Sequence, residues 1–166
     1  MRHKAVFNLR NSPQWLLWIQ KNGSKFTQKA FAEFLEENYP DITKPVGAEM
    51  LDIANTLEIV NTALFRSAQR LNNSTNSLQY ETQHTTKAGE KGNLEVPRFF
   101  TLTIPIFYGE PAIDLQARLK YSLDDGKVIF WYELVRAQQA VDASIEAMAK
   151  EIEAATGLKP YVGKLA

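Results

Sequence analysis

The sequence predicts an α+β fold in which an antiparallel sheet of about five strands carries helices packed mainly on one face. Apolar residues recur at helical spacing early in the chain, alternate with a period of two later, and return to helical spacing near the end. We therefore expect a single domain over residues 1–166, with helices at about 13–57, strands at about 62–135 and a C-terminal helix at about 136–156.

The chain opens with a short alternating segment and then a helix start signal. Apolar side chains alternate over residues 5–9, which predicts a short strand. Ser12 is a favourable N-cap and Pro13 suits the first helical turn, while the pair Asn22-Gly23 ends the pattern. A helix is expected from about 13 to 21.

This first helix carries Trp15 and Trp18 on one stripe. A helix of about nine residues is marginal in water without tertiary contacts. We expect the two tryptophans to dock the helix on the body of the domain; the alternative is that one ring meets a partner.

Two further helices precede the strands. Thr27 is the expected N-cap of the second, which places Phe31, Phe34 and Leu35 on one face and ends at "NYPDITKP". The third is expected over residues 47–57. Its apolar stripe consists of Met50, Ile53, Ala54 and Leu57.

Strand patterns occupy the middle of the chain. Residues 62–71 and 77–86 flank an Asn- and Ser-rich turn and predict a hairpin whose register stays open. Residues 99–106 predict a strand in which Pro105, lacking a donor, indicates an edge position or an irregularity.

The dipeptide Asp125-Gly126 predicts a tight two-residue hairpin turn, which fixes the register of the strands on either side. One side should hold the pairs Ala117–Leu134, Leu119–Tyr132, Tyr121–Phe130 and Leu123–Val128. The other side should hold Arg118–Glu133, Lys120–Trp131 and Ser122–Ile129. A long helix should follow, with Val141, Ile145, Met148 and Ile152 on one stripe and Gly157 as its C-terminal cap.

Several stretches resemble a known family. They are Trp15, Trp18 and "NG" at 22–23, "FAEFLEENYPDI", "AEMLDIANTLE", and "WYELVRAQQAVDASIEAM" followed by "ATGLKP". On these residues the chain resembles the C-terminal part of the YfdQ-like proteins of phages and prophages, a family of unknown function. The resemblance implies a phage or prophage origin and lends no catalytic residue.

Composition limits the chemistry. Nineteen basic residues balance nineteen acidic ones, so no global field attracts nucleic acid or an anionic membrane. The absence of cysteine fits a cytoplasmic protein, and no apolar run is long enough for a membrane span. With only His3 and His84, and no phosphate-loop or nucleophile motif, we expect neither a metal nor a cofactor and find no sign of an enzyme. Asp124 and Asp125 could bind a cation, but a tight turn explains them better.

The candidate binding site is the second face of the sheet. It should carry Arg66, Arg70, Arg118, Lys120, Trp131 and Glu133. Tyr108 could add a further aromatic platform, whereas Glu81 and Asp114 oppose a basic field there. The pair Arg118–Glu133 is interpreted as a cross-strand ion pair, with a tuned catalytic carboxylate as the alternative.

These observations favour an accessory protein that acts by binding a host or phage protein, in the cytoplasm of the bacterial host, with interference in host defence as one version. Single-stranded nucleic-acid binding in phage recombination or replication is the first alternative. An unrecognised hydrolase is the second. A second copy of the chain could also cover the mixed face and make a homo-oligomer.

Overall fold

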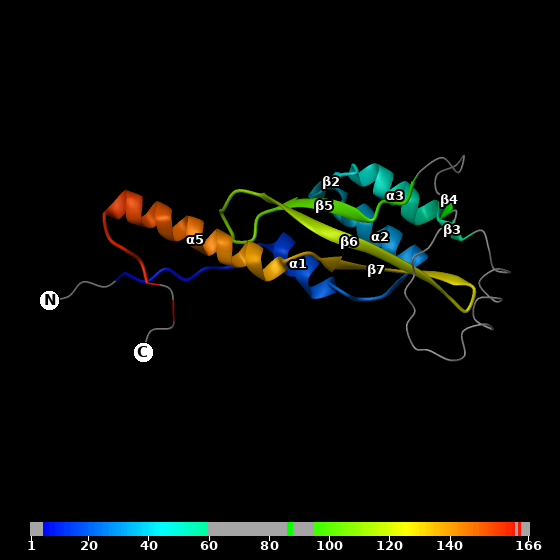
Figure 1. Cartoon of the computed structure of the whole chain (residues 1–166), viewed down its shortest axis with the longest axis horizontal. Coiled ribbons are helices and arrows are strands. Elements are labelled where there is room, and N and C mark those ends of the chain that lie inside the picture. Colours follow the sequence, from blue (N-terminus) through cyan, green and yellow to red (C-terminus); the bar gives the residue numbers. More distant parts are fainter. Residues whose placement is uncertain (1–4, 60–85, 88–94, 162, 164–166) are drawn as a thin grey trace.

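The computed structural model describes residues 5–59, 86–87, 95–161 and 163. It confirms the α+β class and the antiparallel five-stranded sheet, whose strand order is β1-β7-β6-β5-β2. The strands β7, β6, β5 and β2 are labelled in Figure 1. The strands are β1 (Phe26–Thr27), β2 (Ile42–Lys44), β5 (Phe99–Ile104), β6 (Ile113–Asp124) and β7 (Lys127–Leu134). A separate two-stranded sheet joins β3 (Glu58–Ile59) to β4 (Thr86–Lys87).

The helices lie where the sequence predicts them. They are α1 (Pro13–Lys21), α2 (Gln28–Asn38), α3 (Gly47–Thr56) and α5 (Ala137–Thr156), with a short 3-10 turn at Tyr39–Asp41. Ser12 caps α1, since its Oγ accepts the Trp15 backbone N–H at 2.9 Å. Gly157 ends α5 with a left-handed φ of 70°, a conformation that suits glycine.

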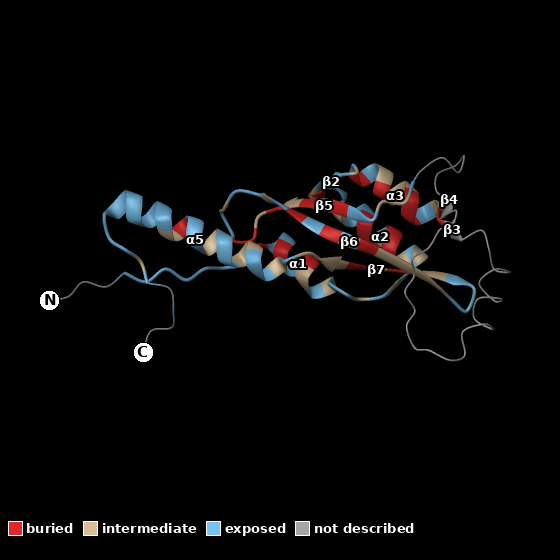
Figure 2. Cartoon of the chain, in the orientation of Figure 1, coloured by how far each residue is buried: buried red, intermediate tan, exposed pale blue. Residues whose placement is uncertain are grey.

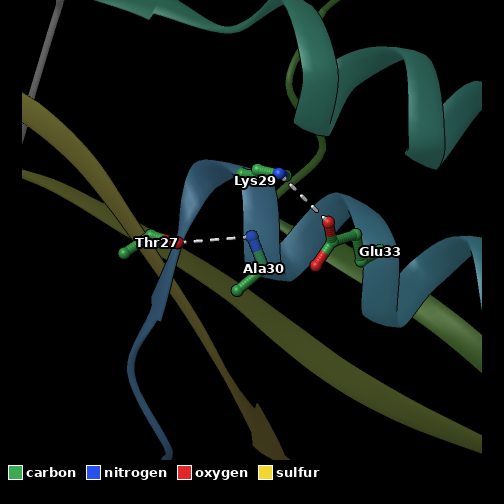
Figure 3. A network of polar contacts seen from close by, with 4 residues as sticks. All are labelled: Thr27, Lys29, Ala30 and Glu33. Carbon is green, nitrogen blue, oxygen red and sulfur yellow. Dashed lines mark hydrogen bonds and ion pairs between the residues drawn. The ribbon is translucent and has the colours of Figure 1, made fainter.

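The start of α2 shows how local chemistry fixes a helix end (Figure 3). The Thr27 hydroxyl accepts the backbone N–H of Ala30 at 3.3 Å and so satisfies one of the free donors of the first turn. Lys29 Nζ in the first turn lies 3.7 Å from Oε1 of Glu33, which is one turn further along the helix, in an exposed i,i+4 pair. The predicted cap is confirmed.

The hairpin of β6 and β7 has the predicted register. Ala117 lies opposite Leu134, Leu119 opposite Tyr132, Tyr121 opposite Phe130 and Leu123 opposite Val128. At the turn, Asp125 and Gly126 have φ values of 46° and 76°, the positive angles that a tight hairpin turn requires.

The core lies on one face of the sheet, and the helices supply its other side (Figure 2). The sheet contributes alternate residues: Phe100, Leu102, Ile104, Leu115, Ala117, Leu119, Phe130 and Tyr132. The helices contribute Trp15, Trp18, Phe31, Ala32, Phe34, Leu35, Met50, Ile53 and Ala54, with Leu57 following α3. The apolar stripes predicted for the three N-terminal helices are therefore buried.

Trp18 docks α1 on this core. Its side chain is 0% exposed, and its ring lies 4.9 Å from that of Phe34 and 5.3 Å from that of Tyr132, both edge to face. The indole Nε1–H donates to Asp41 Oδ2 at 2.8 Å. The Tyr132 hydroxyl donates to the Trp18 carbonyl at 2.7 Å, which satisfies an acceptor in the last turn of the helix. Trp15 is 4% exposed, so both tryptophans are core residues, as predicted.

The strand expected over residues 5–9 is wrong: residues 5–10 form no strand and are exposed, with Phe7 73% accessible. The apolar residues that alternate in this segment do not lie against a face of the sheet. The sheet instead takes β1 and β2 from the region expected to be helical and connecting. The hairpin expected over 62–86 falls almost wholly outside the described residues.

The outer edges of the long strands are occupied by short segments. Beyond β1, Gly23 N–H donates to the Tyr132 carbonyl at 2.8 Å, and Asn22 Oδ1 accepts the Leu134 N–H at 2.8 Å. On the other side β5 lies between β6 and β2, so the edge position considered for Pro105 is wrong. The β5–β6 pairing ends at Ile104, one residue before the proline that has no N–H to donate.

The helix α5 continues away from the sheet (Figure 1). Its predicted stripe is covered only in part: Met148 is buried, Val141 and Ile145 are partly buried, and Ile152 is 38% exposed. Residues 150–158 are all exposed, as the pale end of the helix shows (Figure 2).

Candidate functional site

The face of the sheet opposite the core is the candidate site, and we call it the open face. On the three long strands it comprises Phe99, Thr101, Thr103, Asp114, Gln116, Arg118, Lys120, Ser122, Asp124, Lys127, Ile129, Trp131 and Glu133. All of them are exposed or partly exposed, because strand side chains alternate between the two faces and the core takes the other set. No described helix packs over these residues.

Four of the six predicted site residues meet on this face. Arg118 lies opposite Glu133 and Lys120 opposite Trp131, as the turn predicts. Arg66 and Arg70 lie outside the described residues, as does Glu81. Tyr108 belongs to the loop after β5, where its ring lies 4.4 Å from the Arg10 guanidinium carbon and its N–H donates to the Arg10 carbonyl at 2.8 Å.

The centre of the open face is a row of three side chains from three strands. Phe99, Arg118 and Glu133 are neighbours in register on β5, β6 and β7. The Arg118 guanidinium carbon lies 5.5 Å from the centre of the Phe99 ring, and its Nη1 lies 3.8 Å from Glu133 Oε2. Both charged side chains are 47% exposed, so the pair adds little stability.

The next row centres on Trp131. Lys120 lies directly opposite it on β6, and Lys25 Nζ reaches to 5.9 Å from the centre of the Trp131 ring. Lys25 is the residue immediately before β1, the strand that pairs with the edge of β7 opposite β6. One partly exposed indole is thus flanked by cations from two segments.

Hydroxyls and a carboxylate close the opposite end of the open face. Thr103 Oγ1 donates to Asp114 Oδ1 at 2.7 Å, and Thr43 Oγ1 lies 2.8 Å from Thr103 Oγ1. This chain of contacts joins β2, β5 and β6 across the surface. The carboxylate of Asp114 therefore already accepts a hydrogen bond within the chain.

The charges of the open face differ in whether they are paired. Asp114 bonds to Thr103 and Glu133 pairs with Arg118. Among the described residues, Lys25 and Lys120 form no ion pair. Asp124 and Lys127, register partners next to the hairpin turn, form no ion pair there either. The unpaired cations of this part of the structure are therefore Lys25, Lys120 and Lys127, against the carboxylate of Asp124, and the first two lie beside Trp131.

The carboxylates of Asp114 and Glu133 do not form an acid–base pair. Asp114 and Arg118 are four residues apart on β6, or about 13 Å at the rise of a strand, and Glu133 lies beside Arg118. Glycosidase carboxylates lie roughly 5–9.5 Å apart. The geometry favours the ion-pair interpretation of Glu133 over a tuned catalytic group.

A cation site is also without support in the described part of the chain, where no group of three His, Cys, Asp or Glu residues is placed to hold a metal. Asp124 and Asp125 lie at the exposed hairpin turn, where the positive φ of Asp125 accounts for the local sequence.

Phe99 and Lys25, whose side chains contact Arg118 and Trp131, were not predicted from the sequence. Phe99 could have been found, because consecutive aromatics at 99 and 100 in a strand must point to opposite faces. Lys25 could not, since β1 is only two residues long and carries no periodic signal.

The fold and this surface define an α+β protein with a helix-covered sheet face and an opposite face that no described helix covers. The chain belongs to the family of uncharacterized conserved proteins DUF2303, whose model matches residues 1–165. That family has no named catalytic function. Comparison with curated proteins and with solved structures found no match. Within the described ranges, no helix has the length and apolar character needed to cross a membrane.

Proposed function

We propose that this chain is a phage- or prophage-encoded accessory protein that acts by binding another protein through its open face, without catalysing a reaction. The resemblance to the YfdQ-like proteins supports the phage origin. On this proposal the protein acts in the cytoplasm of the bacterial host, with a host or phage protein as its partner. Interference with a host defence factor is one form such binding would take.

The observation that carries the proposal is the cluster of Phe99, Arg118 and Trp131 on three adjacent strands. Phe99 is 40% exposed, Arg118 is exposed and Trp131 is partly exposed. Tryptophan and arginine are enriched among residues that dominate protein–protein binding energy, and aromatic residues are enriched at interfaces. Because a hydrogen-bonded sheet holds their backbones, little conformational entropy is lost when a partner covers them.

The charge pattern favours a protein over a nucleic acid. Glu133 and Asp114 interrupt the cations of the open face, and the chain has a formal net charge of +0. Nucleic-acid affinity depends on a continuous basic patch that contacts several phosphates. Interleaved charges of both signs are instead typical of a surface that selects a protein partner by complementarity.

Affinity capture with open-face variants tests the proposal. Wild-type protein, Arg118→Glu and Trp131→Ala would be immobilised and exposed to lysate of phage-infected or prophage-carrying cells. Lys29→Glu is the matched control, because it makes the same charge change at an exposed site on α2. We expect the wild type and the control to retain one partner protein in stoichiometric amount. Both open-face variants should lose it. A retained protein that is indifferent to the open face would contradict the proposal.

Single-stranded nucleic-acid binding is the second candidate, and the cation–aromatic contacts of Arg118 with Phe99 and of Lys25 with Trp131 favour it. It predicts a salt-sensitive mobility shift of an oligothymidine that weakens when Arg66, Arg70 and Arg118 are replaced together. No shift at low salt would remove this candidate.

A further inference from the structure

We infer that the Trp131 end of the open face binds an acidic segment of the partner protein, in which carboxylates flank an apolar side chain. This inference rests on the proposed function and names the chemistry that one part of the site recognises. We call Trp131, Lys120 and Lys25 the lysine–tryptophan patch.

The geometry of this patch separates it from the neighbouring row. Lys120 and Trp131 are register partners, and Lys25 reaches the ring from the adjoining edge at 5.9 Å. In the next row, Arg118 has Glu133 beside it at 3.8 Å. The arginine thus has its counter-charge within the chain, whereas the two lysines have none among the described residues.

This difference constrains what can cover the patch. A partner that packs on the partly exposed indole removes water from the lysines next to it. Taking an ammonium group out of water is costly unless an opposite charge replaces the water. An apolar surface alone would therefore bind poorly, whereas carboxylates beside an apolar side chain would satisfy both parts of the patch.

Phosphate is the competing anion, and the surroundings disfavour it. Single-stranded nucleic acid binds along a basic track with successive aromatic platforms. Here Glu133 lies two residues from Trp131 on the same strand and the same face. A run of phosphates that left the lysines along β7 past Trp131 would meet that carboxylate.

Fluorescence provides a direct test, because the other two tryptophans, Trp15 and Trp18, are 4% and 0% exposed. Binding at the patch should therefore change mainly the Trp131 emission and its quenching by acrylamide. The intact chain would be titrated with a short peptide that has one leucine between glutamates. A second peptide with glutamines in place of the glutamates, and an oligothymidine, would be titrated in parallel.

We expect the acidic peptide to protect Trp131 from acrylamide and the glutamine peptide to bind at least tenfold more weakly. Lys25→Ala and Lys120→Ala should each weaken binding about two- to fivefold, as expected for exposed charge pairs, and added salt should weaken it further. Trp131→Ala, followed by peptide anisotropy, should lose at least tenfold in affinity. Lys29→Ala is the control and should bind as the wild type does.

Three results would overturn the inference. They are equal binding of the two peptides, protection by oligothymidine but not by the acidic peptide, and a lysine-dependent self-association showing that a second copy occupies the patch. The proposed function fails separately. If the captured partner depends on Arg118 but not on Lys25 and Lys120, partner binding stands and the acidic-segment inference falls.

Discussion

The two faces of the β6–β7 hairpin differ sharply in how far their side chains are exposed. On one face Phe130 and Tyr132 are 0% exposed beneath the helices. On the other, the intervening residue Trp131 is partly exposed between two lysines. The same backbone ladder serves both faces, so the environment of each side chain is set by its parity along the strand.

The comparison separates stability from recognition. The core face is continuous with α1 and α2 through stacked and edge-to-face aromatic contacts, such as Phe31 on Phe130 at 4.9 Å. The open face has a loose ion pair and unpaired lysines. Substitutions on the first face should lower the free energy of unfolding, while those on the second should change what the protein binds.

The largest difference is expected between two tryptophans. Trp18→Ala should lower the free energy of unfolding by about 3–5 kcal/mol, since it leaves a cavity in a close-packed core. Trp131→Ala should cost under about 1 kcal/mol, as at other partly exposed positions. Urea denaturation followed by circular dichroism measures both. Equal losses would show that the open face is not a free surface.

The Asp41 carboxylate is the next test of the core face, because it accepts the Trp18 indole N–H at 2.8 Å. Asp41→Ala leaves that buried donor unpaired and should cost about 1–3 kcal/mol. Asp41→Asn keeps an acceptor and should cost less, which urea denaturation would confirm. An alanine variant as stable as the asparagine variant would mean that the bond is not required.

Asp41 also gives the core face a pH dependence. Burial raises the pKa of its carboxyl above the ordinary 3.8, and the bond from Trp18 offsets part of that increase. The folded chain then holds the proton more tightly than the unfolded chain, so this contribution is full below pH 3.8 and is lost as pH rises through the raised pKa. The stability of the wild type minus that of Asp41→Asn should fall across this window in urea titrations. A rising difference would contradict the sign.

Tyr132→Phe should have a smaller effect. The ring stays in the core, but the Trp18 carbonyl loses the hydroxyl that donates to it at 2.7 Å. The expected loss is about 0.5–1.5 kcal/mol in the free energy of unfolding. Burial also raises the pKa of this hydroxyl, so ultraviolet titration should show delayed ionisation that is absent from the phenylalanine variant.

The smallest effect is expected on the open face. A double-mutant cycle with Arg118→Ala and Glu133→Ala should give a coupling of about 0.2–1 kcal/mol, since the pair is 3.8 Å apart and both side chains are 47% exposed. The same variants should impair partner capture far more than stability. A coupling above about 3 kcal/mol would indicate a buried pair and an open face that is covered in the folded protein.

The parts of the candidate site that the sequence predicted are those whose geometry is set by residues close together in the chain. The Asp125-Gly126 turn fixes the register of a hairpin, so the sequence placed Arg118, Lys120, Trp131 and Glu133 on one face. Lys25 joins them only because β1 pairs with β7 across about one hundred residues of chain. No local pattern encodes that contact.

The sequence by itself determined the helices and the central hairpin, because caps, apolar spacing and a turn that needs positive φ act within a few residues. Tertiary structure decided the outer strands, since β1 and β2 are too short for any periodicity and exist as strands through their neighbours' hydrogen bonds. It also decided that residues 5–10 stay exposed despite their alternation. Whether an apolar pattern is buried depends on a surface that other parts of the chain must supply, and that surface gave this sheet one packed face and one open face.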